Sequence, residues 1–313
     1  MEFFHKVSTF PFMHTRKVWY GVSIAAVLVS LALLIVRPLN FGIDFTGGIS
    51  MEFTFAQNVD ADQVREALKS AGIHDPVVQP RLESPHDALV KLIHRPEDGD
   101  INSINGKVRE TLLKIDPNAT IRPSEVIGAQ VGQELTEQGG LAVLFTFILI
   151  GIYTWIRFQW KMGVSAVIAT LHDPIIILGF FSLTQIPFDL AVLAAILAVI
   201  GYSLNDTVVV FDRVRENFHG MRQASTETIL DASINQTLSR TVITSGATLL
   251  VVVVLLIMGG ETLRGFSWAL TIGILVGTYS SIYVAGALSL ELKLSARDLM
   301  PVQKEDKELD ALP

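Results

Sequence analysis

Apolar residues gather along the chain in six runs that are long enough to cross a membrane. About 20 apolar residues in a helix span the roughly 30 Å of hydrocarbon in a bilayer. The second run is short, and we expect its helix to begin near Leu135. The pattern therefore predicts a polytopic α-helical membrane protein with six transmembrane helices. The runs are Val18–Val36, Gly140–Ile156, Gly163–Leu183, Leu190–Phe211, Thr241–Met258 and Phe266–Leu290.

The first run has two interpretations, a cleaved signal peptide or a retained span. Its basic flank fits both. Its apolar core is too long for a signal peptide, and no small-x-small cleavage site precedes Arg37. We therefore expect a tail at residues 1–17 and a retained first helix at residues 18–36.

Alternating strands and amphipathic helices fill residues 37–134, between the first two runs. Their order, β-α-β-β-α-β, predicts a small α+β domain of the ferredoxin-like type. His74, His86 and His94 are scattered in it, without metal-ligand spacing. The expected elements are strands at Ile49–Phe55, Pro76–Leu82, Ala88–Ile93 and Thr120–Ile127, helices at Val59–Leu68 and Ile101–Ile115, and a turn at Glu83–Asp87.

A glycine-rich motif, Phe41–Gly48, stands directly before the first of these strands. Paired glycines permit backbone conformations that other residues avoid. One interpretation is a turn that launches the strand. The other is a hinge, made by Gly42, Asp44, Gly47 and Gly48, that lets the domain tilt relative to the first helix.

Lysine and arginine in the short loops predict the orientation of the chain, because these residues favour the cytoplasmic side. The tails and the loops after the second and fourth runs are basic, so we expect both termini in the cytoplasm and residues 37–134 outside. A five-helix bundle follows at residues 135–292, and a tail at residues 293–313. The basic residues are Lys6, Arg16, Lys17, Arg157, Lys161, Arg213, Arg215, Arg222, Lys293, Arg297, Lys304 and Lys307, against Arg264 in the short loops of the other side.

Composition agrees with a membrane protein. Half of the 313 residues are hydrophobic, 18% are charged and the mean hydropathy is +0.45. The chain has no cysteine, so no disulfide braces the external domain. The sequence shows no nucleotide-binding P-loop, metal site or cofactor site, and nothing that predicts an enzyme or a nucleic-acid partner.

Asp206 lies inside the fourth apolar run, about 8 Å from its cytoplasmic end at 1.5 Å per residue. A charged residue at membrane depth costs at least ~2.5–3.5 kcal/mol on insertion scales, which marks a functional site. Arg240 opens the fifth run at the same end. It either reaches Asp206 or extends to the lipid headgroups. If it reaches, the pair is a candidate proton switch, with Asn205 and Thr244 beside it.

Asp173 is a second acidic residue at membrane depth, in the stretch Leu171–Pro174 of the third run. It lies about 15 Å from the cytoplasmic start of that run. Pro174 removes one helical hydrogen bond. The site is either a structural kink or, with His172, part of a secondary proton path.

Small residues recur every four positions in the sixth run. This spacing permits close helix packing, either within the chain or against a partner subunit. They are Gly273, Gly277, Ser281 and Ala285.

Taken together, these stretches resemble the SecF family, the smaller membrane subunits of the bacterial SecD–SecF complex, within the resistance–nodulation–division superfamily. The resemblance covers nearly all of residues 18–292. It is carried by Phe41–Gly48, Leu171–Asp173, Gly201–Asp206, Asp212–Asn217, Arg240–Gly246, Gly259–Phe266 and Gly277–Tyr283.

The resemblance implies a subunit that pairs with SecD, associates with the SecYEG translocon and YajC, and uses the proton motive force in late steps of protein export. The implied location is the bacterial inner membrane, with an unfolded polypeptide as the exported partner. The family's membrane aspartate and arginine map onto Asp206 and Arg240. Two alternatives stay open: half of a small-molecule exporter of the same superfamily, and a structural scaffold for the translocon.

Overall fold

The computed structural model describes residues 8–58, 60–74, 76–81, 84–93, 101–122 and 125–299. Four positions named in the predicted elements, Val59, Leu82, Glu83 and His94, lie outside these residues, as do the ends of both tails.

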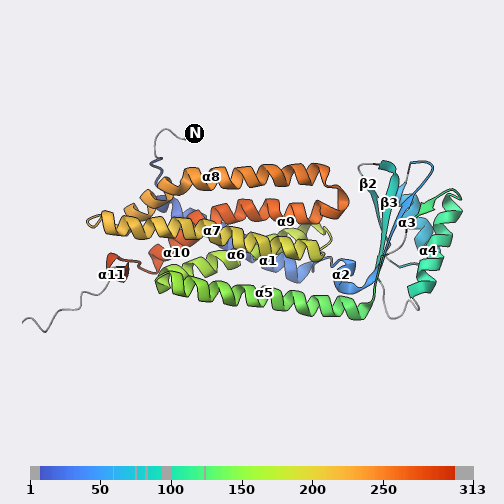
Figure 1. The fold of residues 1–313 in the computed structure, drawn as a ribbon, viewed down its shortest axis with the longest axis horizontal. Helices are drawn as coiled ribbons and strands as arrows, with labels where there is room; N and C mark the ends of the chain where they lie inside the picture. The colour runs from blue at the N-terminus through green and yellow to red at the C-terminus, as the bar shows by residue number, and fades with distance from the viewer. Residues whose placement is uncertain are drawn as a thin grey trace, which may run out of the picture.

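Six long helices form an elongated bundle with a small sheet domain at one end (Figure 1). The six predicted apolar spans are confirmed by the length and hydropathy of these helices. The last span is one continuous rod made of α9, a π-helical segment η3 and α10. The elements are α1 (Arg16–Val36), α5 (Ala129–Arg157), α6 (Trp160–Thr184), α7 (Leu190–Gly220), α8 (Thr226–Met258), α9 (Gly260–Tyr279), η3 (Ser280–Ala285) and α10 (Gly286–Glu291), with short helices η1 (Met13–Thr15) and α11 (Ala296–Leu299) at the far end.

Several helices are longer than the apolar runs that predicted them. Helix α5 begins at Ala129, before the expected start near Leu135, and α8 begins at Thr226, so Arg240 lies within a helix and not at its beginning. The extensions are amphipathic, and they bury apolar side chains such as Phe218, Ile229 and Ile234 in a common core. Hydropathy marks the part of a helix that is apolar all round, so it misses extensions that have one polar face.

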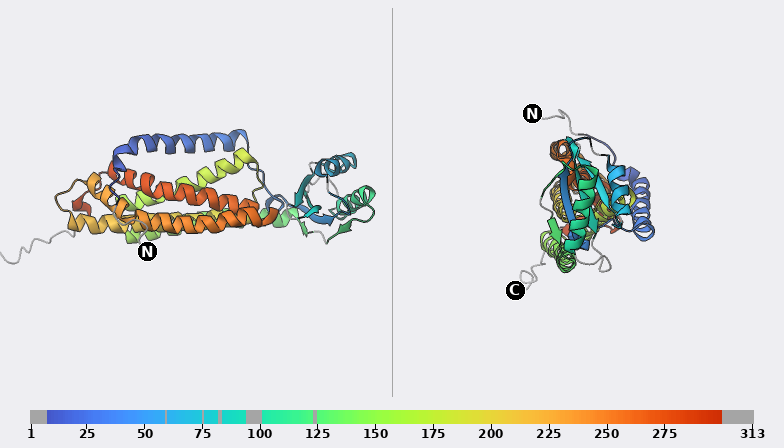
Figure 2. Two further views of the ribbon diagram at one scale, coloured as in Figure 1. Left: turned by 90° about the horizontal axis from the view of Figure 1, so that it is seen from above. Right: turned by 90° about the vertical axis from the view of Figure 1, so that its right-hand side faces the viewer.

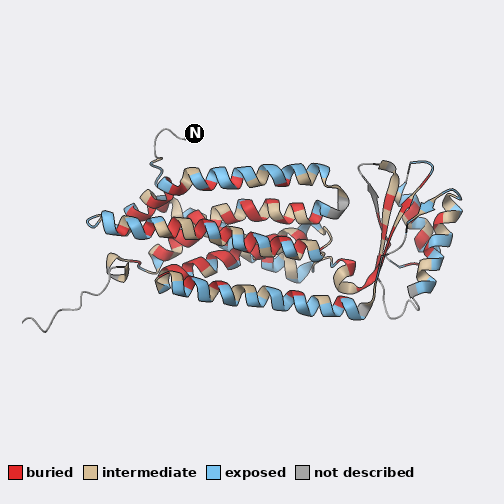
Figure 3. Cartoon of the chain, in the orientation of Figure 1, coloured by how far each residue is buried: buried red, intermediate tan, exposed pale blue. Residues whose placement is uncertain are grey.

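Three of the spans are central and three are peripheral (Figures 2 and 3). In the most apolar windows of α6, α7 and the α9–α10 rod, 56%, 44% and 56% of the residues are buried, against 11% in α1 and 17% in α5 and α8. Phe181, Val199 and Ile200 are among the side chains packed between the central helices. The peripheral helices expose apolar faces to the surroundings, as membrane spans do.

The sheet domain is antiparallel, with strand order β2-β3-β1-β4. Strand β5 also pairs with β1, at its beginning, whereas β4 pairs with the end of β1. Two sequence predictions were wrong in detail. Residues 84–87, expected in a turn, belong to β3, where Asp87 pairs with Thr54. The expected last strand is two short strands. The elements are β1 (Gly48–Thr54), α3 (Ala61–Ser70), β2 (Val77–Arg81), β3 (Ser84–Ile93), α4 (Ile101–Ile115), β4 (Thr120–Ile121) and β5 (Glu125–Ile127).

Alternate residues of β1 pack the sheet against its two helices. Ile49, Met51 and Phe53 are each at most 1% exposed and pack with Leu68 of α3 and Leu112 of α4. The carboxylate of Asp60 caps α3 by accepting hydrogen bonds from two backbone N–H groups. The domain therefore has its own apolar core.

Gly48 is expected to be intolerant of any side chain. Its φ is +157°, and an added Cβ would lie 2.1 Å from the carbonyl oxygen of Leu92 in the paired strand β3. Gly48→Ala should lower the free energy of unfolding by about 3 kcal/mol or more, combining backbone strain with displacement of β3. Thermal unfolding of the purified protein, followed by circular dichroism, measures this loss.

Gly106→Ala is the matched control for that experiment. Gly106 lies within α4, where an added Cβ meets nothing within 4 Å. Alanine is the better helix former by about 0.5–1 kcal/mol, so this variant should be as stable as the parent or slightly more stable. Similar losses in both variants would contradict the role assigned to Gly48.

Candidate functional site

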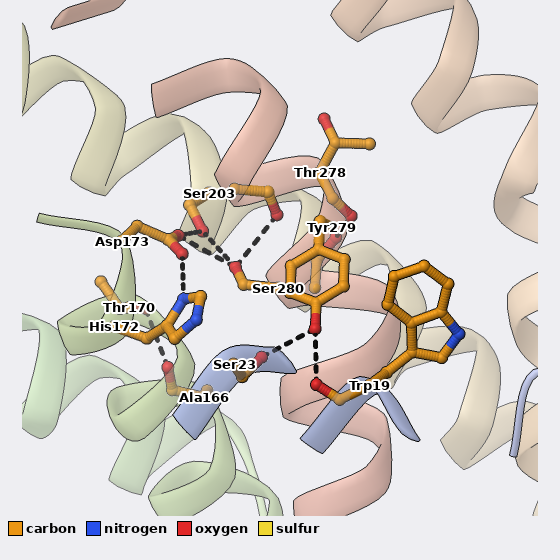
Figure 4. A network of polar contacts seen from close by, with 12 residues as sticks. Trp19, Ser23, Ala166, Thr170, His172, Asp173, Ser203, Thr278, Tyr279 and Ser280 are labelled. Carbon is orange, nitrogen blue, oxygen red and sulfur yellow. Dashed lines mark hydrogen bonds and ion pairs between the residues drawn. The ribbon is translucent and has the colours of Figure 1, made fainter. Parts of the chain in front are cut away.

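Asp173 lies at the centre of a polar cluster buried between α6, α7 and η3 (Figure 4). Its side chain is fully buried. One carboxylate oxygen accepts hydrogen bonds from the hydroxyls of Ser203, over 2.5 Å, and Ser280, over 3.0 Å. The other oxygen lies 2.9 Å from Nδ1 of His172. Each carboxylate oxygen of Asp173 is therefore hydrogen-bonded inside the bundle.

Close approach of α7 and α9 makes this cluster possible. An added Cβ on Gly273 would lie 2.3 Å from a methyl group of Val199, and one on Gly277 would lie 3.1 Å from Cβ of Ser203. The small residues at these two positions pack within the chain, which is the simpler of the two interpretations of their spacing. Directly after this contact the helix widens into η3, which includes Ser280. Short π-helical segments inside α-helices are frequent at functional sites.

The cluster continues to the peripheral helix α1. The rings of His172 and Tyr279 are 6.3 Å apart. The Tyr279 hydroxyl donates a 2.8 Å hydrogen bond to the carbonyl of Trp19 and lies 2.8 Å from the hydroxyl of Ser23 (Figure 4). Nε2 of His172 is buried and has no hydrogen-bond partner. Polar groups therefore occur from the centre of the bundle to α1, and among the described residues a ring contact, not a hydrogen bond, connects His172 with Tyr279.

Asp206 lies on the same helix as Ser203, one turn further along α7. Its side chain is 3% exposed, and Oδ2 has no hydrogen-bond partner. Its interacting neighbours are Ser245 and Arg240, both on α8. Ser245 in turn bonds to Thr278 over 2.8 Å and accepts a 3.3 Å hydrogen bond from Tyr202. Asp206 is therefore held beside a chain of hydroxyl groups with part of its own hydrogen-bonding capacity unused.

The structure does not bring every predicted site residue to this carboxylate. Arg240, Asn205 and Thr244 are exposed on the surface of the bundle. Thr244 donates to the carbonyl of Arg240 in its own helix, over 3.0 Å. Within the described part of the chain, no ion pair joins Arg240 to Asp206. Asp206 and Arg240 therefore lie on two neighbouring helices, α7 and α8, without an ion pair between them.

The two aspartates belong to one polar seam. Ser203 and Asp206 are three residues apart on α7, so both face the same side of that helix. Ser203 reaches Asp173, and Asp206 lies about 4.5 Å further along the axis. The seam offers carboxylates, hydroxyls and an imidazole, which are groups that take up, pass and release protons. No cluster of metal-ligating residues occurs in the described ranges.

The glycine-rich motif lies at the other end of α7, against the sheet domain. Gly42 precedes the short helix α2 (Ile43–Thr46), Gly47 and Gly48 connect it to β1, and Asp44 bonds to the start of α7. Asp189, at that start, is partly buried, and this burial raises the pKa of its carboxyl above the usual range, against the lowering effects of the hydrogen bond from the N–H of Val192 and of nearby Lys91. The motif is a packed joint between the sheet domain and the bundle.

Sequence reasoning missed Ser280 and Tyr279. Both lie in the sixth apolar run, where Tyr279, Ser280 and Ser281 are a polar group within an otherwise apolar stretch. That interruption was the available signal. Its meaning depends on the π-helical turn, which no local pattern predicts.

Two family models match the chain. The model for the C-terminal part of protein export membrane proteins SecD/SecF matches residues 107–295, and the model for the SecD/SecF GG motif matches residues 32–59. The protein translocase subunit SecF of Vibrio alginolyticus is 46% identical over 97% of both chains. That of Pseudomonas aeruginosa is 44% identical over 96% of this chain and 97% of its own.

A solved structure supports the same grouping. The crystal structure of SecDF, a translocon-associated membrane protein from Thermus thermophilus, superposes with a TM-score of 0.80 at 35% identity. The match covers 91% of this chain and 39% of the SecDF chain, so the solved protein is much longer. The family models, the identity over whole chains and the shared fold show that this chain belongs to the SecF family of protein translocase subunits.

Proposed function

We propose that this protein is the proton-coupling subunit of a complex that uses the proton motive force to promote late stages of protein export across the bacterial inner membrane. The observation that carries the proposal is Asp206, a buried carboxyl group in a membrane helix whose Oδ2 has no partner. A charged carboxylate is costly in such a place unless a cation or a proton reaches it. The site therefore suits a group that gains and loses a proton during work.

Arg240 is the cation in the proposed switch. It lies on the neighbouring helix α8, exposed and without an ion pair to Asp206. With the proton present on Asp206, no attraction draws the arginine inward. After the proton leaves, the carboxylate attracts Arg240, and α8 shifts against α7. Each cycle thus converts a proton transfer into a helix displacement.

The cluster around Asp173 is the proposed secondary path. Ser203 connects it to the face of α7 that carries Asp206. His172 has an unused nitrogen for proton exchange. Asn205 and Thr244, both exposed, are proposed to complete the path once a partner covers their side of the bundle.

The proposed partners follow from the family and from the exposed surface. SecD is the first, because the solved SecDF chain is more than twice as long as the part matched here. Arg240, Asn205 and Thr244 lie on a surface otherwise suited to lipid, and a second subunit would cover them. We further propose association with SecYEG and YajC, and an unfolded polypeptide as cargo.

The proposed orientation has both termini in the cytoplasm and the sheet domain outside. The basic tails and loops support it through their lysine and arginine content. We assign the sheet domain to the ferredoxin-like class on its element order, β-α-β-β-α followed by two short strands. The protein acts as a transporter subunit and carries out no covalent chemistry.

Replacing Arg240 with methionine tests the switch, because methionine keeps length and removes charge. In vesicles that contain the whole export complex, Arg240→Met should reduce gradient-stimulated export about tenfold or more, since one charge in the membrane potential is worth ~2.3 kcal/mol per 100 mV. The export that remains after an ionophore has collapsed the gradient should be the same in this variant and in the parent protein.

Arg222→Met is the matched control. Arg222 is exposed and lies in the turn after α7, away from Asp206. The Arg222→Met variant should leave both the gradient-stimulated rate of export and the rate without a gradient unchanged. If Arg240→Met keeps full stimulation by the gradient, Arg240 is a lipid anchor and the switch is wrong. If the protein instead purifies without any larger membrane subunit, the self-contained exporter is favoured.

A further inference from the structure

The segment that leads from α1 to the sheet domain is fastened by its main chain to the loop before α7. The N–H of Phe188 donates to the carbonyl of Asn40 over 2.7 Å, and the N–H of Gly42 donates to the carbonyl of Phe188 over 2.8 Å. Phe41 and Phe188 thus form an isolated parallel β-bridge. The side-chain amide of Asn40 adds a 3.0 Å bond to the carbonyl of Gln185. Two distant parts of the chain are fixed together here.

Asp44 extends this fastening to α7 itself. Its Oδ2 accepts a 2.8 Å hydrogen bond from the N–H of Leu190, the first residue of α7. The first four N–H groups of any helix lack partners within the helix. Asp189, the residue before α7, supplies the usual local cap to Val192. The cap from Asp44 comes from a separate segment, so α2 and the start of α7 are held as one unit.

Close packing leaves little room for movement within this unit. The rings of Phe45 and Phe188 are 5.8 Å apart. An added Cβ on Gly132 of α5 would lie 2.8 Å from the backbone nitrogen of Gly47. Gly47 itself has φ +74°, and Gly48 already belongs to β1. Between the bond to α7 and the sheet, the chain is one turn of helix and one tightly seated glycine.

We propose that residues 40–48 are a rigid coupler between the sheet domain and α7, with Asp44 as its positioning residue. Movement of the sheet domain would then displace α7, and movement of α7 would displace the sheet domain. Helix α7 is unbroken from Leu190 to Gly220, so a shift at its start reaches Asp206 about 24 Å away. The inference rests on the proposed function, since it gives the proton site a mechanical output.

A reversible crosslink separates a coupler from a hinge. An added Cβ on Gly42 lies 3.2 Å from Cβ of Asp189, close to the 3.5–4.5 Å spacing of a disulfide. The chain has no cysteine, so Gly42→Cys with Asp189→Cys creates a unique pair. For a coupler, the oxidised variant in the whole complex should export at the gradient-driven rate of the same variant after reduction, within about twofold.

Two outcomes of the crosslink experiment would overturn the coupler. One is loss of gradient-driven export on oxidation that a reductant reverses, because the segments would then have to separate in each cycle. The other is failure of the pair to oxidise, because the segments would then not stay in contact. Absence of any gradient stimulation in the parent protein would refute the proposed function instead, so the two failures are distinguishable.

Substitutions at Asp44 test the positioning role. Asp44→Ala should lower gradient-driven export about fivefold, the change that corresponds to losing a typical helix cap. Asp44→Asn keeps an oxygen acceptor for the Leu190 N–H and should retain the parent rate. Asp60→Ala removes a comparable cap from α3, inside the sheet domain, and should leave export unchanged. Equal losses in Asp44→Ala and Asp60→Ala, or no rescue by Asp44→Asn, would refute the role.

Discussion

Asp206→Asn is expected to abolish the gradient-driven part of export and to leave a folded, assembled protein. Asparagine has nearly the shape of a protonated aspartate but cannot release a proton. The switch would therefore stay in one state. The expected loss is at least about tenfold in the gradient-stimulated rate, since a single charge in a 100 mV potential is worth ~2.3 kcal/mol. The measurement is export of a presecretory protein into vesicles, with and without a proton gradient.

Stability distinguishes loss of coupling from loss of structure in this variant. Oδ2 of Asp206 has no hydrogen-bond partner to lose, so the thermal midpoint should match or exceed that of the parent. Asp212→Asn is the control on the same helix. Asp212 is partly exposed and pairs with Arg157 at 2.5 Å, a contact expected to contribute ~1 kcal/mol or less. Unchanged gradient stimulation in Asp206→Asn would refute the proton switch.

Asp173→Leu is expected to lower the free energy of unfolding, whereas Asp206→Asn is not. Leucine would remove the acceptor of the buried Ser203 hydroxyl and the partner of the His172 ring, and Ser280 would keep only the carbonyl of Gly277, over 3.1 Å. A buried polar group without a partner costs about 1–3 kcal/mol, so the combined loss should be roughly 3–5 kcal/mol. Thermal unfolding in detergent or lipid measures it.

A triple variant separates the structural role of Asp173 from its proposed role in proton transfer. Replacing all partners with apolar groups can be nearly neutral. Asp173→Leu combined with Ser203→Ala and Ser280→Ala should therefore recover the part of the lost stability that comes from the two hydroxyls, while the part that comes from His172 remains. Export driven by the gradient should stay impaired, because the path would lack its carboxyl group. Recovery of both properties would make the cluster purely structural, and parent-like stability of Asp173→Leu alone would show that the cluster does not stabilise the bundle.

The sheet domain shows which local patterns were reliable. The expected helix at Ile101–Ile115 is confirmed with the same bounds, and the strand at Ile49–Phe55 is shifted by one residue. Both have one buried face, so their apolar residues recur along the sequence with the period of a helix or a strand. The turn expected at Glu83–Asp87 was wrong over residues 84–87, which belong to β3: Ser84 pairs with Arg81 of β2, and Asp87 pairs with Thr54 of β1. Pairing with a distant strand overrides local turn preference.

For the site, too, the local sequence predicted some features and not others. Asp206 and Asp173 were identified by their charge within apolar runs, and that much depends on local hydropathy. Which aspartate is satisfied was not predictable, since Ser203 and Ser280 reach Asp173 from two other helices. The glycines of the motif at residues 41–48 suggested either a turn or a hinge. Their packing against α5, α7 and β3 is the basis for the proposed coupler.

The sequence by itself determined that this chain spans a membrane six times, carries a small α+β domain after the first span and has two aspartates at membrane depth. Tertiary structure alone decided the partners of those aspartates. Helix rotation and separation depend on contacts such as Gly273 with Val199, and on the π-helical turn that places Ser280. A linear pattern records how apolar each position is, but neighbours across the bundle depend on how whole helices pack.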